Sequence, residues 1–314
     1  MLQANILIYL LLPWSLSLAG WPELSPSLYY YKEETVDQTV LHPSGVTEQR
    51  WLPSDTDQPD LTVSPPFITR LVIPPGSQHP QEEEGYWLAS DAYYVVIEGS
   101  VVFGHMPGVV HEYGDLYWVM GGEVHGPVYN VGDMGCTLLI TSTAQVSPRG
   151  GAEAPSDDNP SVDTSLVRER SYRQVDGGSW RNNPSPHSQA CLDNGGVQNM
   201  GFNMLDNSPA ALRVRWAPSC QIPYHYHPTG ALYFIQYGVM LFQGDGITPD
   251  VPFYKGEVRW VRPGYAYGPE YNSDDEPMEI TVLGTDTPPT FHDPPDGPFK
   301  MQKDLIVTHV FDEL

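Results

Sequence analysis

The 314-residue sequence predicts an all-β protein built from two tandem barrels. The strongest observation is an internal repeat with a long period. Both copies consist of short runs rich in Val, Ile, Tyr, Phe and Trp, separated by Gly, Pro, Asn and Asp, which is the pattern of antiparallel strands joined by turns. The chain has 29 glycines and 32 prolines, which suits many turns and leaves little room for long helices. It is also long enough to give each of two domains its own core.

The repeat is clearest in residues 114-130 and 256-272. These segments read GDLYWVMGGEVHGPVYN and GEVRWVRPGYAYGPEYN, and they agree without gaps at eight of seventeen positions. Upstream, RLVIPPGSQ and RVRWAPSCQ occupy corresponding places in the two copies. Self-similarity of this kind marks a duplicated structural unit, so we expect one barrel over residues 61-144 and a second over residues 205-285.

The segments outside the two copies are polar and rich in Pro, Gly, Ser and Asp. We expect residues 20-60 to lie along the edge of the first barrel as an arm rather than to form a domain. Residues 145-204 are expected to be a mobile linker with one short helical turn around residues 167-173.

The two ends of the chain predict a secretory protein. Residues 1-19 carry no charged side chain and place Ser17 and Ala19 where a signal peptidase reads small residues. The alternative, a membrane anchor, is disfavoured because Pro13 interrupts a run that is already short for a bilayer. The tail, residues 286-314, ends in Phe-Asp-Glu-Leu, which differs only at its first position from a signal for retention in the endoplasmic reticulum. We therefore expect a protein of that lumen, or a secreted one, without membrane attachment after cleavage.

Charge and cysteine content limit the classes of partner. The chain has 39 acidic and 15 basic residues, a net charge of -24, which disfavours binding to nucleic acid or to anionic lipid surfaces. The three cysteines are too few for a disulfide framework and show no C-x-x-C spacing. Cys136, Cys191 and Cys220 therefore leave two options open, one pair plus a free thiol or no pair.

The segment YHYHPTGALYFIQYG in the second copy contains a candidate metal site. His225 and His227 are separated by one residue, so on a strand both imidazoles lie on the same face and can bind one ion. Open metal sites with such ligands normally take at least three protein side chains. The candidates for the third ligand are Tyr267, Tyr233 and, if its turn folds over the barrel, Glu270.

These residues resemble the motifs of the cupin superfamily, G-x5-H-x-H-x3-E-x6-G and G-x5-P-x-G-x2-H-x3-N. His225 and His227 fall on the two histidines of the first motif and Gly238 falls on its closing glycine. Gly256 and Gly264 fall on the glycines of the second motif. The resemblance implies two small jelly-roll barrels in one chain, the arrangement called a bicupin.

The sequence also departs from the cupin motifs. In the second copy, the glutamate position of the first motif holds Ala231 and the histidine position of the second motif holds Tyr267. In the first copy, the corresponding four positions hold Tyr86, Leu88, Ala92 and His125. We therefore expect the first barrel to be metal-free, with His125 a hydrogen-bonded structural residue.

Two functions remain open at this point. In the first, the protein is an enzyme in which His225 and His227, with Tyr267 as the candidate third ligand, bind a divalent transition metal (Fe, Mn, Zn, Ni or Cu), and Tyr233 or Tyr267 is the catalytic proton donor. The resemblance allows oxygenase, decarboxylase, isomerase or lyase chemistry on a small organic molecule, and it implies association into homo-oligomers. In the alternative, the protein is a non-catalytic ligand-binding or storage-type cupin without metal, whose two histidines hydrogen-bond to the tyrosines.

Overall fold

The structure is a computed structural model of the chain. It describes residues 28-52, 65-80, 86-142, 149-150, 169-173, 180-182, 189-202, 211-222, 225-227, 231-242, 251-272 and 276-283. The predicted signal peptide, residues 1-19, and the predicted tail, residues 286-314, lie outside the described residues. In the described part of the chain, no helix is both long and apolar enough to cross a membrane.

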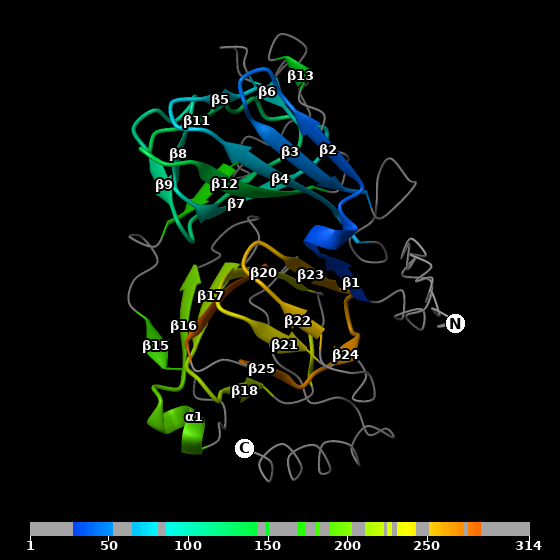
Figure 1. The fold of residues 1–314 in the computed structure, drawn as a ribbon, viewed down its shortest axis with the longest axis vertical. Helices are drawn as coiled ribbons and strands as arrows, with labels where there is room; N and C mark the ends of the chain where they lie inside the picture. Colours follow the sequence, from blue (N-terminus) through cyan, green and yellow to red (C-terminus); the bar gives the residue numbers. More distant parts are fainter. Residues whose placement is uncertain are drawn as a thin grey trace, which may run out of the picture.

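The described elements are almost all strands, and they form two barrels (Figure 1). The elements that build the N-terminal barrel are β2 (Gln38–Leu41), β3 (Thr47–Trp51), β4 (Phe67–Ile73), β5 (Gln78–His79), β6 (Tyr86–Trp87), β7 (Ala92–Glu98), β8 (Ser100–Phe103), β9 (Val110–Glu112), β10 (Leu116–Val119), β11 (Val128–Asn130), β12 (Cys136–Ser142), β13 (Arg149–Gly150) and β14 (Glu169–Tyr172). A seven-stranded sheet in the order β14-β10-β7-β12-β4-β3-β2 is accompanied by a four-stranded sheet in the order β5-β11-β8-β9.

The C-terminal barrel repeats this plan. Its elements are β1 (Leu28–Tyr31), β15 (Arg181–Asn182), α1 (Gln189–Asp193), β16 (Val197–Phe202), β17 (Ala211–Trp216), β18 (Gln221–Ile222), β19 (His225–Tyr226), β20 (Ala231–Tyr237), β21 (Met240–Phe242), β22 (Val251–Phe253), β23 (Val258–Val261), β24 (Ala266–Tyr267), β25 (Glu270–Asn272) and β26 (Met278–Leu283). Its sheets run β1-β23-β20-β26-β17-β16-β15 and β18-β25-β21-β22. A 3-10 turn, η1 (Glu33–Thr35), follows β1. The predicted fold class, two tandem jelly-roll barrels, is confirmed.

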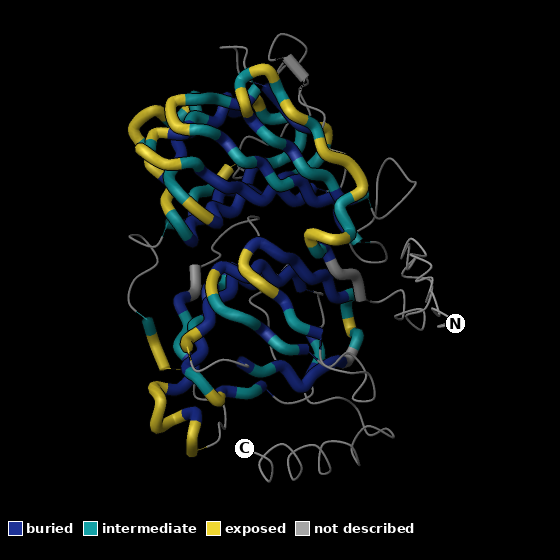
Figure 2. Tube along the Cα trace, in the orientation of Figure 1, coloured by how far each residue is buried: buried dark blue, intermediate teal, exposed yellow. Residues whose placement is uncertain are grey.

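Alternation along the central strands explains why both faces of each large sheet are buried. In β20, Tyr233 and Ile235 belong to the core of the C-terminal barrel, whereas Leu232 and Phe234 point the other way, into a third apolar cluster. That cluster also contains Val95 and other residues of the N-terminal barrel. The two seven-stranded sheets therefore pack against each other, and Figure 2 shows the buried chain on both sides of this contact.

The two barrels exchange strands. β1 precedes the first barrel in the sequence but pairs with β23 of the second, whereas β14 precedes the second barrel but pairs with β10 of the first. Because β10 and β23 are equivalent in the repeat, β1 and β14 fill the same place in the two sheets. The segment expected as an arm is divided: β2 and β3 extend the first barrel's sheet, and β1 crosses to the second barrel.

The predicted helical turn at residues 167-173 is wrong, because residues 169-172 are strand β14. Pairing with β10 lets this segment bury Tyr172 and gives its backbone the hydrogen bonds that a helix would have supplied.

Further along the expected linker, α1 carries Cys191, which forms a disulfide with Cys220 across the start of the second barrel. Cys136 is a buried free thiol. The structure thus selects one pair plus a free thiol from the two options that the sequence left open.

Candidate functional site

The two histidines of the candidate metal site lie side by side inside the C-terminal barrel. Both side chains are buried, whereas the intervening Tyr226 is half-buried, as alternation on a strand requires. Their ring centroids are 5.0 Å apart. β19 pairs with β24, which puts His225 opposite Tyr267 with ring centroids 4.5 Å apart.

A hydrogen-bonded chain links one histidine to both candidate tyrosines. His227 Nε2 is 2.9 Å from the Tyr233 hydroxyl, which in turn is hydrogen-bonded to the Tyr267 hydroxyl. Burial raises the pKa of both phenols well above the ordinary value for tyrosine, so both are protonated at neutral pH. Tyr267 is therefore a neutral phenol that contacts His227 only indirectly, through the hydroxyl of Tyr233.

A buried ion pair completes the polar centre. The Arg259 guanidinium on β23 donates a hydrogen bond to the Glu270 carboxylate on β25, and both side chains are almost fully buried. The guanidinium also lies over aromatic rings, 4.1 Å from the centroid of Tyr233 and 3.8 Å from that of Phe242. Glu270 Oε2 is 3.9 Å from His225 Nε2. Glu270, a sequence candidate only if its turn folded inward, is therefore part of the site through strand pairing with β18 and β21.

Arg259 is the residue that the sequence reasoning missed. Its Nε and Nη1 atoms are buried and have no hydrogen-bond partner in the described part of the chain. The available signal was a basic residue within VRWV, an otherwise apolar run that matches LYWV in the first copy. A buried guanidinium with unused donors costs roughly 1 to 3 kcal/mol unless an anion or water accepts from it. This feature marks Arg259 as a candidate anion-binding residue.

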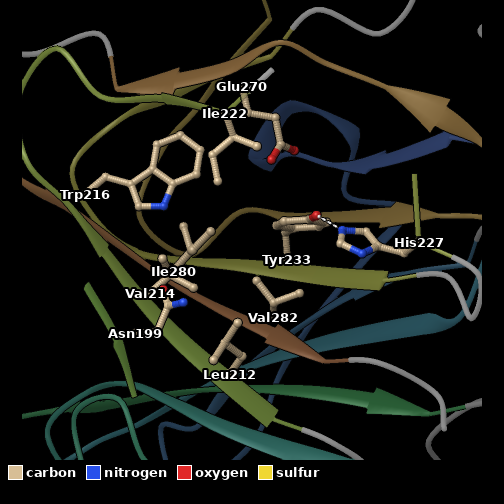
Figure 3. A pocket seen from close by; sticks show the side chains of 10 residues that line it. All are labelled: Asn199, Leu212, Val214, Trp216, Ile222, His227, Tyr233, Glu270, Ile280 and Val282. Carbon is tan, nitrogen blue, oxygen red and sulfur yellow. Dashed lines mark hydrogen bonds between the residues drawn. The ribbon is translucent and has the colours of Figure 1, made fainter. Parts of the chain in front are cut away.

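A small cavity lies beside these polar groups (Figure 3). Its volume is about 10 Å³, room for a single water or ion. Asn199, His227, Tyr233 and Glu270 form its polar part. The rest of the lining is Leu212, Val214, Trp216, Ile222, Ile280 and Val282.

The equivalent centre of the N-terminal barrel is a closed hydrogen-bond network. Tyr86 and Tyr94 share a hydrogen bond of 3.0 Å, and the Tyr94 hydroxyl is 2.7 Å from His125 Nε2. His125 Nδ1 is 2.9 Å from the backbone carbonyl oxygen of Glu123, so both ring nitrogens have partners. This is the structural role predicted for His125. Tyr117 occupies the place of Arg259 and donates to Glu169, a residue of the exchanged strand β14.

Comparisons of sequence find no family model and no curated protein that matches this chain. The fold, however, is similar to several solved structures. The oxalate decarboxylase of Lactobacillus farciminis, solved as a formate complex, is 14% identical with a TM-score of 0.57, over 91% of this chain and 93% of that one. A mutant oxalate decarboxylase of Bacillus subtilis is 13% identical with a TM-score of 0.58, over 84% and 78%. A putative glyoxylate-induced protein of Pseudomonas aeruginosa is 13% identical with a TM-score of 0.51, over 79% and 84%. The chain therefore has the cupin superfamily fold in its two-barrel form.

Proposed function

We propose that this protein binds a small organic acid in its C-terminal barrel, next to a divalent transition metal, and acts on that acid as an enzyme. The observation that carries the proposal is the buried Arg259 guanidinium, whose Nε and Nη1 have no acceptor in the described part of the chain. A guanidinium donates charge-assisted hydrogen bonds to a carboxylate, and in a buried site such a bond is strong because water does not compete for it. Because Nη2, which belongs to both bidentate edges of the guanidinium, already donates to Glu270, a small carboxylate would accept from one of the two remaining donors.

The donor set has the chemistry that a divalent transition metal needs, although the three side chains do not each bring a ligand atom within 4.8 Å of the other two. His225 and His227 supply imidazoles and Glu270 supplies a carboxylate, a ligand class that suits iron, manganese and related ions. The separation of 3.9 Å between His225 Nε2 and Glu270 Oε2 is compatible with two ligands that each lie about 2.1 Å from one ion. Arg259 binds the other carboxylate oxygen, as outer-shell partners of metal ligands commonly do. When bound, the metal would act as a Lewis acid or a redox centre. An oxalate decarboxylase of Bacillus subtilis, 12% identical with a TM-score of 0.57, has been described with Mn(II) centres, which makes manganese the first ion to test.

The protein side chains have separate tasks in this proposal. Arg259 orients the carboxylate of the ligand. Tyr233, a protonated phenol within reach of His227, is the proton donor, and its bond to Tyr267 lets the second phenol replace the proton. The apolar side chains of the lining keep water out. The cavity of about 10 Å³ holds no more than one water or ion, so even the smallest organic acid requires that side chains of the lining move. Because oxalate decarboxylases share the fold, decarboxylation of a two-carbon acid is the reaction to test first.

The test combines elemental analysis with ligand binding. We expect purified protein to contain close to one equivalent of transition metal, which the double variant His225→Ala, His227→Ala loses. Oxalate and formate should bind to the metal-loaded protein, and Arg259→Met combined with Glu270→Gln, which removes both charges together, should weaken that binding at least tenfold. Tyr117→Phe changes the equivalent position of the other barrel and is the control. Less than about a tenth of an equivalent of metal in the wild type, or acid binding that survives the loss of Arg259, contradicts the proposal.

A second candidate function is non-catalytic binding of a small ligand without metal. The observation that favours it is that the Arg259–Glu270 pair is already balanced in charge, while His227 already has a phenol partner. In that case oxalate or formate would bind equally well to the metal-loaded and the metal-free protein, and neither acid would be converted.

We further propose that the protein matures in the secretory pathway and is retained in the endoplasmic reticulum or secreted. The Cys191–Cys220 disulfide supports this, because such bonds persist in oxidising compartments. Removal of the last four residues should move a tagged protein from the lumen to the medium. Sedimentation of the purified chain would show whether it forms homo-oligomers.

A further inference from the structure

A second cluster of metal-ligating side chains lies in the N-terminal barrel, apart from the site above. His42 follows β2 in the turn to β3, Glu48 is on β3, and His79 ends β5. One ligand atom from each of these residues lies within 4.8 Å of the others. The cluster therefore joins the edge of the seven-stranded sheet to the edge of the four-stranded sheet.

The geometry of the cluster leaves one carboxylate oxygen facing the imidazoles. Arg50 Nε donates to Glu48 Oε1 over 2.6 Å, whereas Glu48 Oε2 is 3.0 Å from His42 Nε2. The rings of His42 and His79 lie with their centroids 4.9 Å apart. Although burial of Glu48 opposes ionisation, its bonds to Arg50 and His42 hold its pKa below the ordinary value, so the group is a carboxylate.

We propose that His42, Glu48 and His79 bind one divalent cation of the zinc class. Two imidazoles and one carboxylate are a common donor set for zinc and cobalt, whereas calcium and magnesium prefer oxygen ligands alone. Arg50 fixes the carboxylate from outside the ligand shell. The side chain of His42 is 28% exposed, which gives an ion an entry path and leaves a fourth position on the solvent side. Bound metal would fasten the β2–β3 hairpin to β5.

The repeat shows that this cluster belongs to one barrel only. Strand registers place Asn199 at the position of Glu48, since Asn199 pairs with Val214 as Glu48 pairs with Leu71. By the same reasoning Ile222 stands at the position of His79. The proposed site is therefore not a copy of the candidate site in the C-terminal barrel, and the two sites can be emptied separately.

The experiment uses the full chain, stripped of metal with a chelator and carrying His225→Ala and His227→Ala to empty the other site. Titration with Co²⁺ should show one equivalent with the visible absorption of a low-symmetry N,O site, and Zn²⁺ should displace it and raise the melting temperature. Glu48→Gln and His42→Gln, made singly, should each weaken the binding at least tenfold, whereas Glu112→Gln, an exposed carboxylate on β9, should leave it unchanged.

Two results would overturn the proposal. One is the absence of a Co²⁺ equivalent in the protein that lacks His225 and His227. The other is binding that neither Glu48→Gln nor His42→Gln alters. His42 lies in a partly exposed turn, so its variant keeps the test valid even if a change at the buried Glu48 prevents folding. Since the readout is metal binding and not turnover, the result is independent of the proposed function.

Discussion

His225 lies opposite Tyr267 in the C-terminal barrel, and the N-terminal barrel contains the same pair with the two residue types exchanged, Tyr86 opposite His125. The ring centroids are 4.5 Å apart in the first pair and 4.6 Å apart in the second. In both barrels the hydroxyl of a tyrosine on the central strand, Tyr233 or Tyr94, bonds to a member of the polar group around this pair. The pair therefore acts as one packing unit in which either strand can supply the imidazole.

This relationship predicts that the histidine and the tyrosine of one pair can be interchanged by mutation. His125→Tyr alone loses two buried hydrogen bonds, so we expect it to lower the free energy of unfolding by roughly 1 to 3 kcal/mol. Adding Tyr86→His restores an imidazole opposite a phenol and should recover part of that loss, a coupling of roughly 0.5 to 3 kcal/mol. Urea unfolding of the wild type, both single variants and the double variant measures this cycle. Simple additivity would show that the two side chains are not coupled.

The buried ion pair predicts a strong asymmetry between single and double changes. Glu270→Gln leaves the Arg259 charge without a counter-charge in the core, and we expect a loss of roughly 3 to 5 kcal/mol. The double variant Arg259→Tyr, Glu270→Val copies the residues that the first barrel has at these positions, Tyr117 and Val128, and should recover most of the loss. Chemical denaturation of the wild type and both variants measures these differences in the free energy of unfolding. A cost below about 1 kcal/mol for Glu270→Gln would mean that Arg259 finds another anion or water.

Much of the fold follows from local sequence signals. Runs rich in β-branched and aromatic residues, together with the repeat, predict the strands of both barrels, and the spacing of His225 and His227 predicts that they share a face. These properties depend on neighbouring residues, so a single sequence contains them. The strand exchange is different. The segments LYYY of β1 and ERSY of β14 have four residues each, and nothing within them specifies the barrel that they join.

The features that the sequence did not predict, namely strand β14, the burial of Arg259 and the cysteine pairing, depend on contacts between segments that are far apart in the chain. A charged segment around Glu169 indicated a helical turn, but pairing with β10 overrides local propensity. Arg259 stands in an apolar strand, and the sequence does not show that Glu270 and the surrounding aromatic rings make its burial favourable. The spacing of three cysteines does not determine their pairing, which depends on the position of α1 against the loop before β18.

The Cys191–Cys220 disulfide predicts both a thiol count and a stability cost. The bond closes a loop with a sequence separation of 29, so its removal should cost about 3 to 4 kcal/mol through the entropy of the unfolded chain. Chemical denaturation of Cys191→Ser, Cys220→Ser against the wild type measures the loss. In denaturant without reductant, a thiol reagent should find one thiol per chain rather than three. In the native protein we expect none to react, because burial raises the pKa of the Cys136 thiol to about 12.

The buried His125 predicts that acid begins to destabilise the protein near pH 6.5. Burial lowers the pKa of His125 to about 4, whereas an unfolded histidine titrates near 6.5. Between these values the unfolded state binds a proton that the folded state does not, so stability falls as the pH falls from about 6.5 to 4, by roughly 3 kcal/mol in all. The titratable groups around the ring are the phenols of Tyr86, Tyr94 and Tyr117, the imidazole of His105 and the carboxylate of Glu169.

His125 and Glu169 affect the stability of the protein over different pH ranges, so their contributions can be measured separately. Hydrogen bonding to His105 holds the pKa of Glu169 below its usual value, so the stability that Glu169 contributes is lost only below about pH 4.3. His125→Gln replaces the imidazole with an amide that cannot titrate. We expect the variant to be less stable at pH 7, but to lose less stability between pH 6.5 and pH 4.5 than the wild type in urea unfolding. The other nine histidines are the same in both proteins. Equal pH slopes for the two proteins would therefore show that His125 takes up a proton without unfolding.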